Sequence, residues 1–241
     1  MTAVVAKRIY GIETEYGLSC AIPGHRNLSP DELAKYLFQD LVDEKRTNNV
    51  FLPNGGRLYL DVGSHPEYAT AECNQIADVI AQELAGDQIV RNMAIRAEEL
   101  LRLEGLPAKV FVFKNNADSV GNSFGCHENY SIKRRADQLN QLDGLLPFLA
   151  TRQIFLGAGK LLKTSDGVKY TISQRAEHLW DSVSSATTRS RPIINTRDEP
   201  HADSSQFRRL HVISADSNRS QIPMLLKVAT MDLRHTLVLL E

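Results

Sequence analysis

A strand pattern that runs directly into a turn and a group of acidic residues occupies positions 57–73. Two leucines alternate with three polar residues at its start: Arg57, Leu58, Tyr59, Leu60 and Asp61. This alternation predicts a strand with one apolar and one polar face. Asn54-Gly55-Gly56 predicts the turn before it, and Val62-Gly63-Ser64 predicts a turn after it. His65 is expected to be extended because Pro66 follows it.

Three further polar residues of interest follow within the same short segment: Glu67, Thr70 and Glu72. Carboxylates brought this close repel one another unless a cation lies between them. The segment therefore predicts a cation site, and an edge strand with a solvated polar face remains the alternative.

The first expected strand, within residues 8–17, carries two more carboxylates. Glu13 and Glu15 are two residues apart, so their side chains share one face at a spacing of roughly 7 Å. Paired carboxylates on a strand suit hard cations such as Mg²⁺. A polar outer face is the competing interpretation.

The remaining chain predicts alternating helices and strands. Ser29-Pro30-Asp31-Glu32 predicts a capped helix start before an apolar stripe. Residues 74–103 are expected to be helical, with Ala85-Gly86-Asp87 breaking the segment into two helices. Residues 109–113 predict a strand buried on both faces.

Further along, residues 128–132 predict a strand that brings His127 or Asn129 toward a site. A satisfied structural histidine is the alternative at position 127. Residues 139–156 predict a helix, residues 160–172 a hairpin, residues 208–213 a strand and residues 223–241 an apolar-rich helix.

Arginines are concentrated in and after the polar segment 173–203, which is expected to be largely loop. They are Arg175, Arg189, Arg191, Arg197, Arg208 and Arg209. Arginine binds phosphate and carboxylate groups bidentately, although a surface loop held by salt bridges would have the same composition. Acidic residues for Mg²⁺ together with arginines for anions suit an ATP-using enzyme. The sequence has neither a Walker A pattern nor G-x-G-x-x-G.

Bulk properties exclude several classes of partner. The chain has 241 residues, of which 42% are hydrophobic and 24% charged, with a net charge of −1. This balance gives no electrostatic footprint for nucleic acid or an anionic membrane. No apolar run is long enough for a membrane span, and the first residues do not have the order of a signal peptide. Three widely spaced cysteines indicate reduced thiols, so a cytoplasmic protein is expected.

Five segments together resemble the Pup ligase and Pup deamidase family. They are Gly11-Ile-Glu-Thr-Glu-Tyr-Gly17, Asn54–Cys73, Phe113–Tyr130, Gln174–Asp203 and Arg208–Ile213. The Pup ligases (proteasome accessory factor A) attach the prokaryotic ubiquitin-like protein Pup to lysines of proteins bound for the bacterial proteasome. Gly11-Ile-Glu-Thr-Glu15 and Val62-Gly-Ser-His-Pro-Glu67 are closer to the ligase than to the deamidase.

The resemblance implies an α+β, glutamine-synthetase-like fold: a curved antiparallel sheet with helices packed on its convex side. Residues 1–241 would form the N-terminal part of that catalytic domain, with the family's C-terminal portion absent. It implies Glu13, Tyr59 and Glu67 as metal-binding residues, with Tyr59 acting through its backbone carbonyl or a water. It also implies ATP binding by Arg57 and Thr70. Asp61 matches the catalytic base, and Glu15 and His127 are further possible ligands.

The implied reaction uses Mg²⁺ and ATP, with Pup and lysine-bearing proteins as partners. The γ-carboxylate of the C-terminal glutamate of Pup is phosphorylated, and a lysine then displaces phosphate to form an isopeptide bond. Three alternatives stay open: the Pup deamidase of the same fold, a catalytically incomplete Pup-binding fragment, and a small-molecule γ-glutamyl ligase.

Overall fold

An eight-stranded sheet forms the centre of the protein, whose computed structural model describes residues 8–134, 138–185 and 191–238. Across the sheet, the strands run β10 (Leu179–Ser184), β11 (Arg191–Asn195), β12 (Phe207–Val212), β7 (Cys126–Lys133), β1 (Tyr10–Glu15), β5 (His65–Ala69), β4 (Arg57–Asp61) and β3 (Asn49–Phe51). Among the strand pairs that the described residues form in this sheet, only β10–β11 is parallel. The first strand of the chain thus lies inside the sheet, between β5 and β7.

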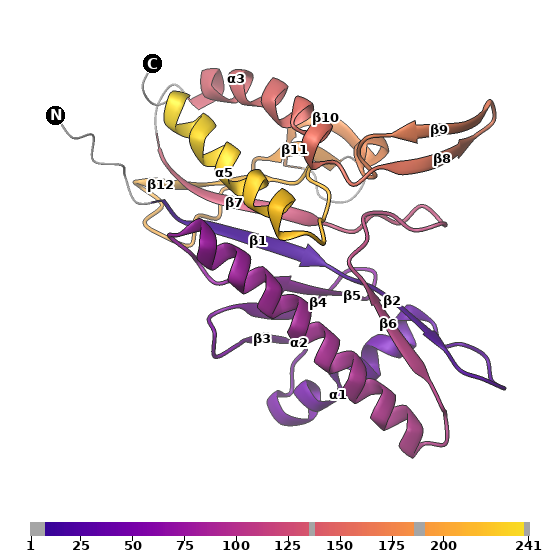
Figure 1. Ribbon diagram of the computed structural model, residues 1–241. Coiled ribbons are helices and arrows are strands. Elements are labelled where there is room, and N and C mark those ends of the chain that lie inside the picture. The colour runs from indigo at the N-terminus through magenta and orange to yellow at the C-terminus, as the bar shows by residue number, and fades with distance from the viewer. Residues whose placement is uncertain (1–7, 135–137, 186–190, 239–241) are drawn as a thin grey trace.

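Helices cover one face of this sheet (Figure 1). They are α1 (Pro30–Lys45), α2 (Ile76–Leu103), α3 (Gln138–Thr151), α4 (Gln153–Leu156) and α5 (Gln221–Val238). One core cluster joins β1, β7 and β12 to α2, α3 and α5, and a second joins β4 and β5 to α1 and α2. Helices on one face of a mostly antiparallel sheet confirm the α+β class.

The alternation predicted for β1 is confirmed. Ile12 and Thr14 are 2% and 0% exposed and face the helices. The Thr14 hydroxyl donates a 2.6 Å hydrogen bond to Glu83 of α2, and Lys114 pairs with the same carboxylate at 2.6 Å. This ion pair balances the charge of Glu83 behind the strand, whose opposite face carries Glu13 and Glu15.

The predicted start of α1 is also confirmed. Ser29 is the N-cap, its hydroxyl accepts from the Glu32 backbone amide, and the Glu32 side chain accepts from the Ser29 amide. Pro30 occupies the first turn, where its missing amide hydrogen costs nothing.

The predicted break at residues 85–87 is wrong, because α2 is continuous from Ile76 to Leu103. Gly86 is buried in the helix against the ring of Tyr68, and a Cβ at this position would lie 2.3 Å from Tyr68 Cδ1. The glycine therefore permits close packing of α2 on β5 and does not end the helix.

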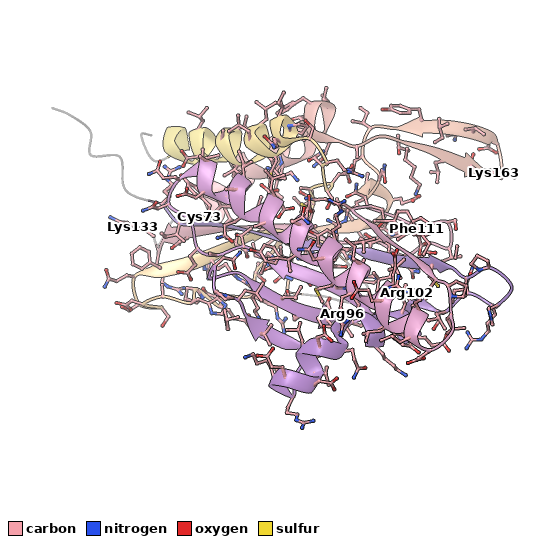
Figure 2. The ribbon with its side chains drawn as sticks, turned by 60° about the horizontal axis from the view of Figure 1, so that its bottom comes forward. Cys73, Arg96, Arg102, Phe111, Lys133 and Lys163 are labelled. Atoms are coloured by element: carbon pink, nitrogen blue, oxygen red, sulfur yellow. The ribbon has the colours of Figure 1, made fainter. Side chains whose placement is uncertain are left out.

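The strand at residues 109–113 forms as predicted, but it is not buried on both faces. In the described part of the chain, β6 (Lys109–Phe113) pairs only with β2 (Gly17–Ala21), outside the main sheet. Phe111 and Phe113 are 40% and 46% exposed, and Figure 2 labels Phe111 on this ribbon. An apolar run alone does not distinguish a central strand from an edge ribbon.

The C-terminal half contains further corrections. The predicted helix at 139–156 is two helices, divided at Arg152, whose guanidinium turns into the core to pair with Glu128. The segment 173–203, expected as loop, contains the short 3₁₀ helix η1 (Ala176–His178) and strands β10 and β11. The predicted hairpin is confirmed as β8 (Lys160–Thr164) and β9 (Gly167–Thr171), which projects from the molecule in Figure 1.

Candidate active site

The face of the sheet opposite the helices carries the predicted polar residues, and strand register brings them together. Glu13 lies opposite Ala69 of β5 and His127 of β7. Glu15 lies opposite Glu67, which in turn lies opposite Tyr59 of β4. Because alternate residues share a face, these four strands present one polar surface.

One group of donors on this surface consists of Glu13, His127 and His211, whose ligand atoms all lie within 4.8 Å of one another. His127 Nδ1 is 3.2 Å from Glu13 Oε2, and Asn129 donates to Glu13 Oε1 at 3.1 Å. Burial alone would raise the pKa of Glu13, but the neighbouring His127 and His211 side chains hold it well below the ordinary value. Glu13 is therefore ionised.

A second group consists of Glu15, Asp61 and Glu67, again within 4.8 Å of one another. Burial opposes ionisation of Glu15, but the hydrogen bond from His65 (Nδ1 to Oε2, 2.8 Å) and the charge of His127 lower its pKa to about 2. Burial and the neighbouring charges of Glu13 and Glu15 raise the pKa of Glu67 well above its ordinary value.

The second group fits a divalent cation on its own chemistry. Three carboxylates are the oxygen donors that Mg²⁺ prefers. Without a cation, Glu67 retains a proton, which is the expected behaviour of like charges sharing a buried site. The first group offers two imidazoles and one carboxylate, a mixed set that also suits softer divalent ions.

Tyr59 lies beside the second group. Burial together with the charges of Glu67 and Glu13 raises the pKa of Tyr59. The phenol is therefore neutral beside the Glu67 carboxylate. Its backbone-carbonyl or water-mediated role remains a prediction.

Arg57 and Thr70 line one cavity of about 420 Å³, together with Glu13 and Arg209. The Arg57 guanidinium stacks 4.6 Å from the ring centroid of Tyr59 and donates from Nε to Asn49 at 2.9 Å. The Thr70 hydroxyl accepts from the Ile12 amide at 3.1 Å, which ties it to β1. A cation, a hydroxyl and an ionised metal-ligand candidate thus meet in a cavity of nucleotide-compatible size.

Asp61 ends β4 and is partly exposed, and its carboxylate belongs to the second donor group. The predicted residues are therefore divided: Asp61 and Glu67 share one group with Glu15, whereas Glu13 belongs to the other. His211 was not among the predicted site residues. Its signal in the sequence was its alternation with Arg209 in the strand at 208–213, opposite a strand that already carried His127.

The arginine-rich segment does not form a single anion site. Arg175 is fully buried and donates to Ser123 and to the carbonyls of Ile213 and Ala215. Arg208 interacts with Asp198 at 3.4 Å. Arg209 faces the site, 3.7 Å from Glu13, while Arg189 lies outside the described residues.

Comparison with known proteins identifies the family. The sequence profile described as Pup-ligase protein matches residues 8–241. The chain belongs to the Pup-ligase family. This confirms the resemblance seen in the sequence.

Two curated relatives show how far the match extends within the Pup-ligase family. The Pup–protein ligase of Kribbella flavida is 59% identical over 227 residues, covering 94% of this chain and 50% of the relative. That of Nocardioides sp. is 56% identical over the same coverage. The chain therefore spans about half the length of the curated relatives it matches.

Solved structures of Pup ligases share the fold. The chain matches the ligase PafA in its complex with Pup with a TM-score of 0.88 and 49% identity, over 95% of this chain and 45% of that one. It matches PafA in complex with ADP with a TM-score of 0.74 and 50% identity, over 89% and 47%. This supports the predicted fold class. Among the described residues, no helix combines the length and apolarity needed to cross a bilayer.

Proposed function

We propose that this chain carries the metal- and nucleotide-binding face of a Pup ligase, and that residues 1–241 form the N-terminal part of its catalytic domain. The observation that supports this is the placement of two donor groups beside a cavity lined by Arg57 and Thr70, on one face of the sheet. The relatives named Pup–protein ligase favour ligation over deamidation.

The proposed site binds ATP with Mg²⁺. Glu13, Tyr59 and Glu67 are the proposed metal-binding residues. Bound Mg²⁺ would neutralise phosphate charge during phosphoryl transfer. Arg57 and Thr70 bind the nucleotide, with Arg57 held by its stacking on Tyr59. His127 and His65 fix the orientation of Glu13 and Glu15.

In the proposed reaction, the γ-carboxylate of the C-terminal glutamate of Pup attacks the γ-phosphorus of ATP and ADP leaves. The amine of a substrate lysine then attacks the acyl carbon, and phosphate leaves as the isopeptide bond forms. Because a free lysine has a pKa of about 10.4, its amine needs a base at neutral pH. Asp61 takes that proton, at the partly exposed end of β4 where a protein acceptor has access. The proposed location is the cytoplasm, where ATP and protein substrates are present.

A gel-shift conjugation assay tests this function, with Pup ending in glutamate, an acceptor protein and Mg-ATP. Asp61→Asn is expected to abolish conjugation and leave ATP binding largely intact. Asp43→Asn changes an exposed carboxyl on α1 and is expected to behave as the wild type. Unchanged conjugation by Asp61→Asn would remove this residue from the role, and Pup binding without ADP release would favour a catalytically incomplete Pup-binding fragment.

A further inference from the structure

A second cavity of about 370 Å³ opens at the Asp61 end of the site, beside the turn between β4 and β5. The nucleotide-compatible cavity lies toward the other end of β1, at Gly11 and Glu13. Its lining includes His65, Asn122, Ser123, His178, Trp180 and Arg191. His65 belongs to both regions, because its ring lines this cavity and its Nδ1 bonds Glu15 at 2.8 Å. One imidazole therefore separates the cavity from the second donor group.

The walls of this cavity are complementary to an anion. Among the described residues, they include one arginine and two histidines but no aspartate or glutamate. In the part of the chain that the structure describes, the Arg191 guanidinium forms no hydrogen bond or ion pair. Glu177, the carboxylate next to His178 in sequence, does not line the cavity; it pairs with Lys160 and lies 3.8 Å from His178 Nε2, too far for a hydrogen bond. By contrast, Arg209 at the nucleotide end already faces Glu13 and Glu199.

Buried polar groups point to the same conclusion. His178 Nε2 is buried and has no hydrogen-bond partner among the described residues. Ser123 accepts from Nε of the fully buried Arg175, whose Nη2 likewise lacks a partner among the described residues. Arg175 does not itself line the cavity and contacts it through Ser123. A buried polar group without a hydrogen bond costs free energy, so the His178 nitrogen in the cavity wall favours a ligand that can form hydrogen bonds.

Resting on the proposed function, we propose that this cavity binds the free α-carboxylate of the glutamate whose γ-carboxylate reacts, with Arg191 as its bidentate partner and His178 as a second donor. Arginine and carboxylate match in geometry, and such charge-assisted pairs are stronger than neutral hydrogen bonds. Trp180 supplies an apolar wall beside the aliphatic part of the ligand. A lysine acceptor would bring its positive charge against Arg191 and is disfavoured there.

This assignment explains how the site would recognise a chain terminus. Only a C-terminal glutamate carries an α-carboxylate next to its γ-carboxylate. An internal glutamate has an amide at that position, which cannot form the bidentate ion pair with Arg191. Arg191 is then a specificity-determining residue, and acidic residues elsewhere in a partner are rejected because they leave it unpaired.

Binding measurements with two forms of Pup test the proposal. One form ends in glutamate with a free α-carboxylate, and the other carries an α-carboxamide at the same residue. Calorimetry on the full chain with Mg²⁺ and ADP is expected to show roughly 10- to 100-fold tighter binding of the free acid. Arg191→Gln is expected to lose most of this difference, because it lowers the affinity for the free acid and leaves that for the amide unchanged. Arg191→Lys is expected to recover part of the difference.

Arg102→Gln is the matched control, since it removes an exposed arginine from the last turn of α2 and should keep the full preference. In conjugation kinetics, Arg191→Gln should raise KM for Pup and leave KM for ATP unchanged, a division that misfolding would not produce. Equal affinity of the wild type for acid and amide, including no binding of either, overturns the proposal. A preference that survives in Arg191→Gln also overturns it.

Failure of the proposed function gives a different result. Preference for the free acid that depends on Arg191, without any conjugation in Mg-ATP, would contradict ligation and support the carboxylate site. Conjugation that proceeds equally with acid and amide would support ligation and overturn the carboxylate site.

Discussion

Burial and nearby negative charge both disfavour ionisation of the Glu67 carboxyl. Burial and the charges of Glu13 and Glu15 raise its pKa, while the Tyr59 hydroxyl partly opposes them. A carboxyl whose folded-state pKa is raised binds its proton more tightly in the folded protein. Its contribution to stability is therefore greatest below the unfolded pKa of about 4.5 and falls as pH rises through the folded value.

Replacing Glu67 by glutamine removes this pH dependence. In EDTA, the wild type is expected to lose more of its free energy of unfolding than Glu67→Gln between pH 5 and pH 8, as measured by urea unfolding. Mg²⁺ should raise the Tm of the wild type more at pH 8 than at pH 5, because the cation replaces the proton, and should raise that of the variant less. Identical pH profiles for the two proteins would show that Glu67 does not carry this proton.

A second residue-scale prediction concerns the buried pair of Arg152 and Glu128, both 0% exposed. Arg152→Met leaves the Glu128 charge without its partner, and the expected loss is about 3–5 kcal/mol of unfolding free energy. The double variant Arg152→Met/Glu128→Leu should recover much of that loss, since it removes the unpaired charge. Urea unfolding measures both.

The control for this pair is Arg96, which is exposed on α2 and contacts Asp40 at 2.9 Å (Figure 2). Exposed pairs are screened by water, so Arg96→Met should leave stability nearly unchanged. Similar losses of unfolding free energy in Arg96→Met and Arg152→Met would contradict the claim that burial makes the Arg152–Glu128 pair important for stability.

At the scale of elements, α2 and β5 are held together where Gly86 meets the Tyr68 ring. By helix propensity, Gly86→Ala would stabilise α2 by about 1 kcal/mol. The added Cβ would lie 2.3 Å from Tyr68, so we expect a net destabilisation on the order of 1–3 kcal/mol by thermal unfolding. Gln88→Ala, at an exposed position of the same helix, should change stability by less than about 0.5 kcal/mol. A stabilised Gly86→Ala variant would show that β5 can move away.

The same contact illustrates how far sequence predicts these elements. Local signals predicted the α1 cap, the alternation in β1 and β4, and the hairpin turn, because each depends on neighbouring residues. Gly86 was misread as a helix break because its partner, Tyr68, is distant in sequence and only the tertiary fold brings the ring there. The strands β10 and β11 were missed because the polar composition of the segment resembles a loop. Pairing with neighbouring strands stabilises them although their intrinsic strand propensity is low.

In the candidate site, too, local features could be predicted from the sequence and tertiary ones could not. Alternation alone placed Arg57, Tyr59 and Asp61 on one face, and Glu13 with Glu15 on another strand's face. The division into two donor groups could not be predicted, since it depends on which strands flank β1. His211 comes from β12, two strands away from β1, and only sheet order brings its ring toward Glu13.

For the molecule as a whole, β1 connects two halves of the sheet. Glu15 shares its donor group with Asp61 of β4 and Glu67 of β5, whereas Glu13 shares its group with His127 of β7 and His211 of β12. Each group therefore spans three strands, with β1 as the common member. A cation in either group would join strands that are otherwise held by backbone hydrogen bonds and by the helices behind them.

Hydrogen exchange tests this connection. We expect Mg²⁺ to slow amide exchange in β1, β4 and β5, because the oxygen-rich group of Glu15, Asp61 and Glu67 is the better match for this ion. The β8–β9 hairpin pairs with no other strand of the described residues and serves as an internal control whose exchange should not change. Glu67→Gln should reduce the protection in all three strands together, since it removes one carboxylate of the shared donor group. Protection spread evenly over the protein, hairpin included, would instead indicate non-specific stabilisation by salt.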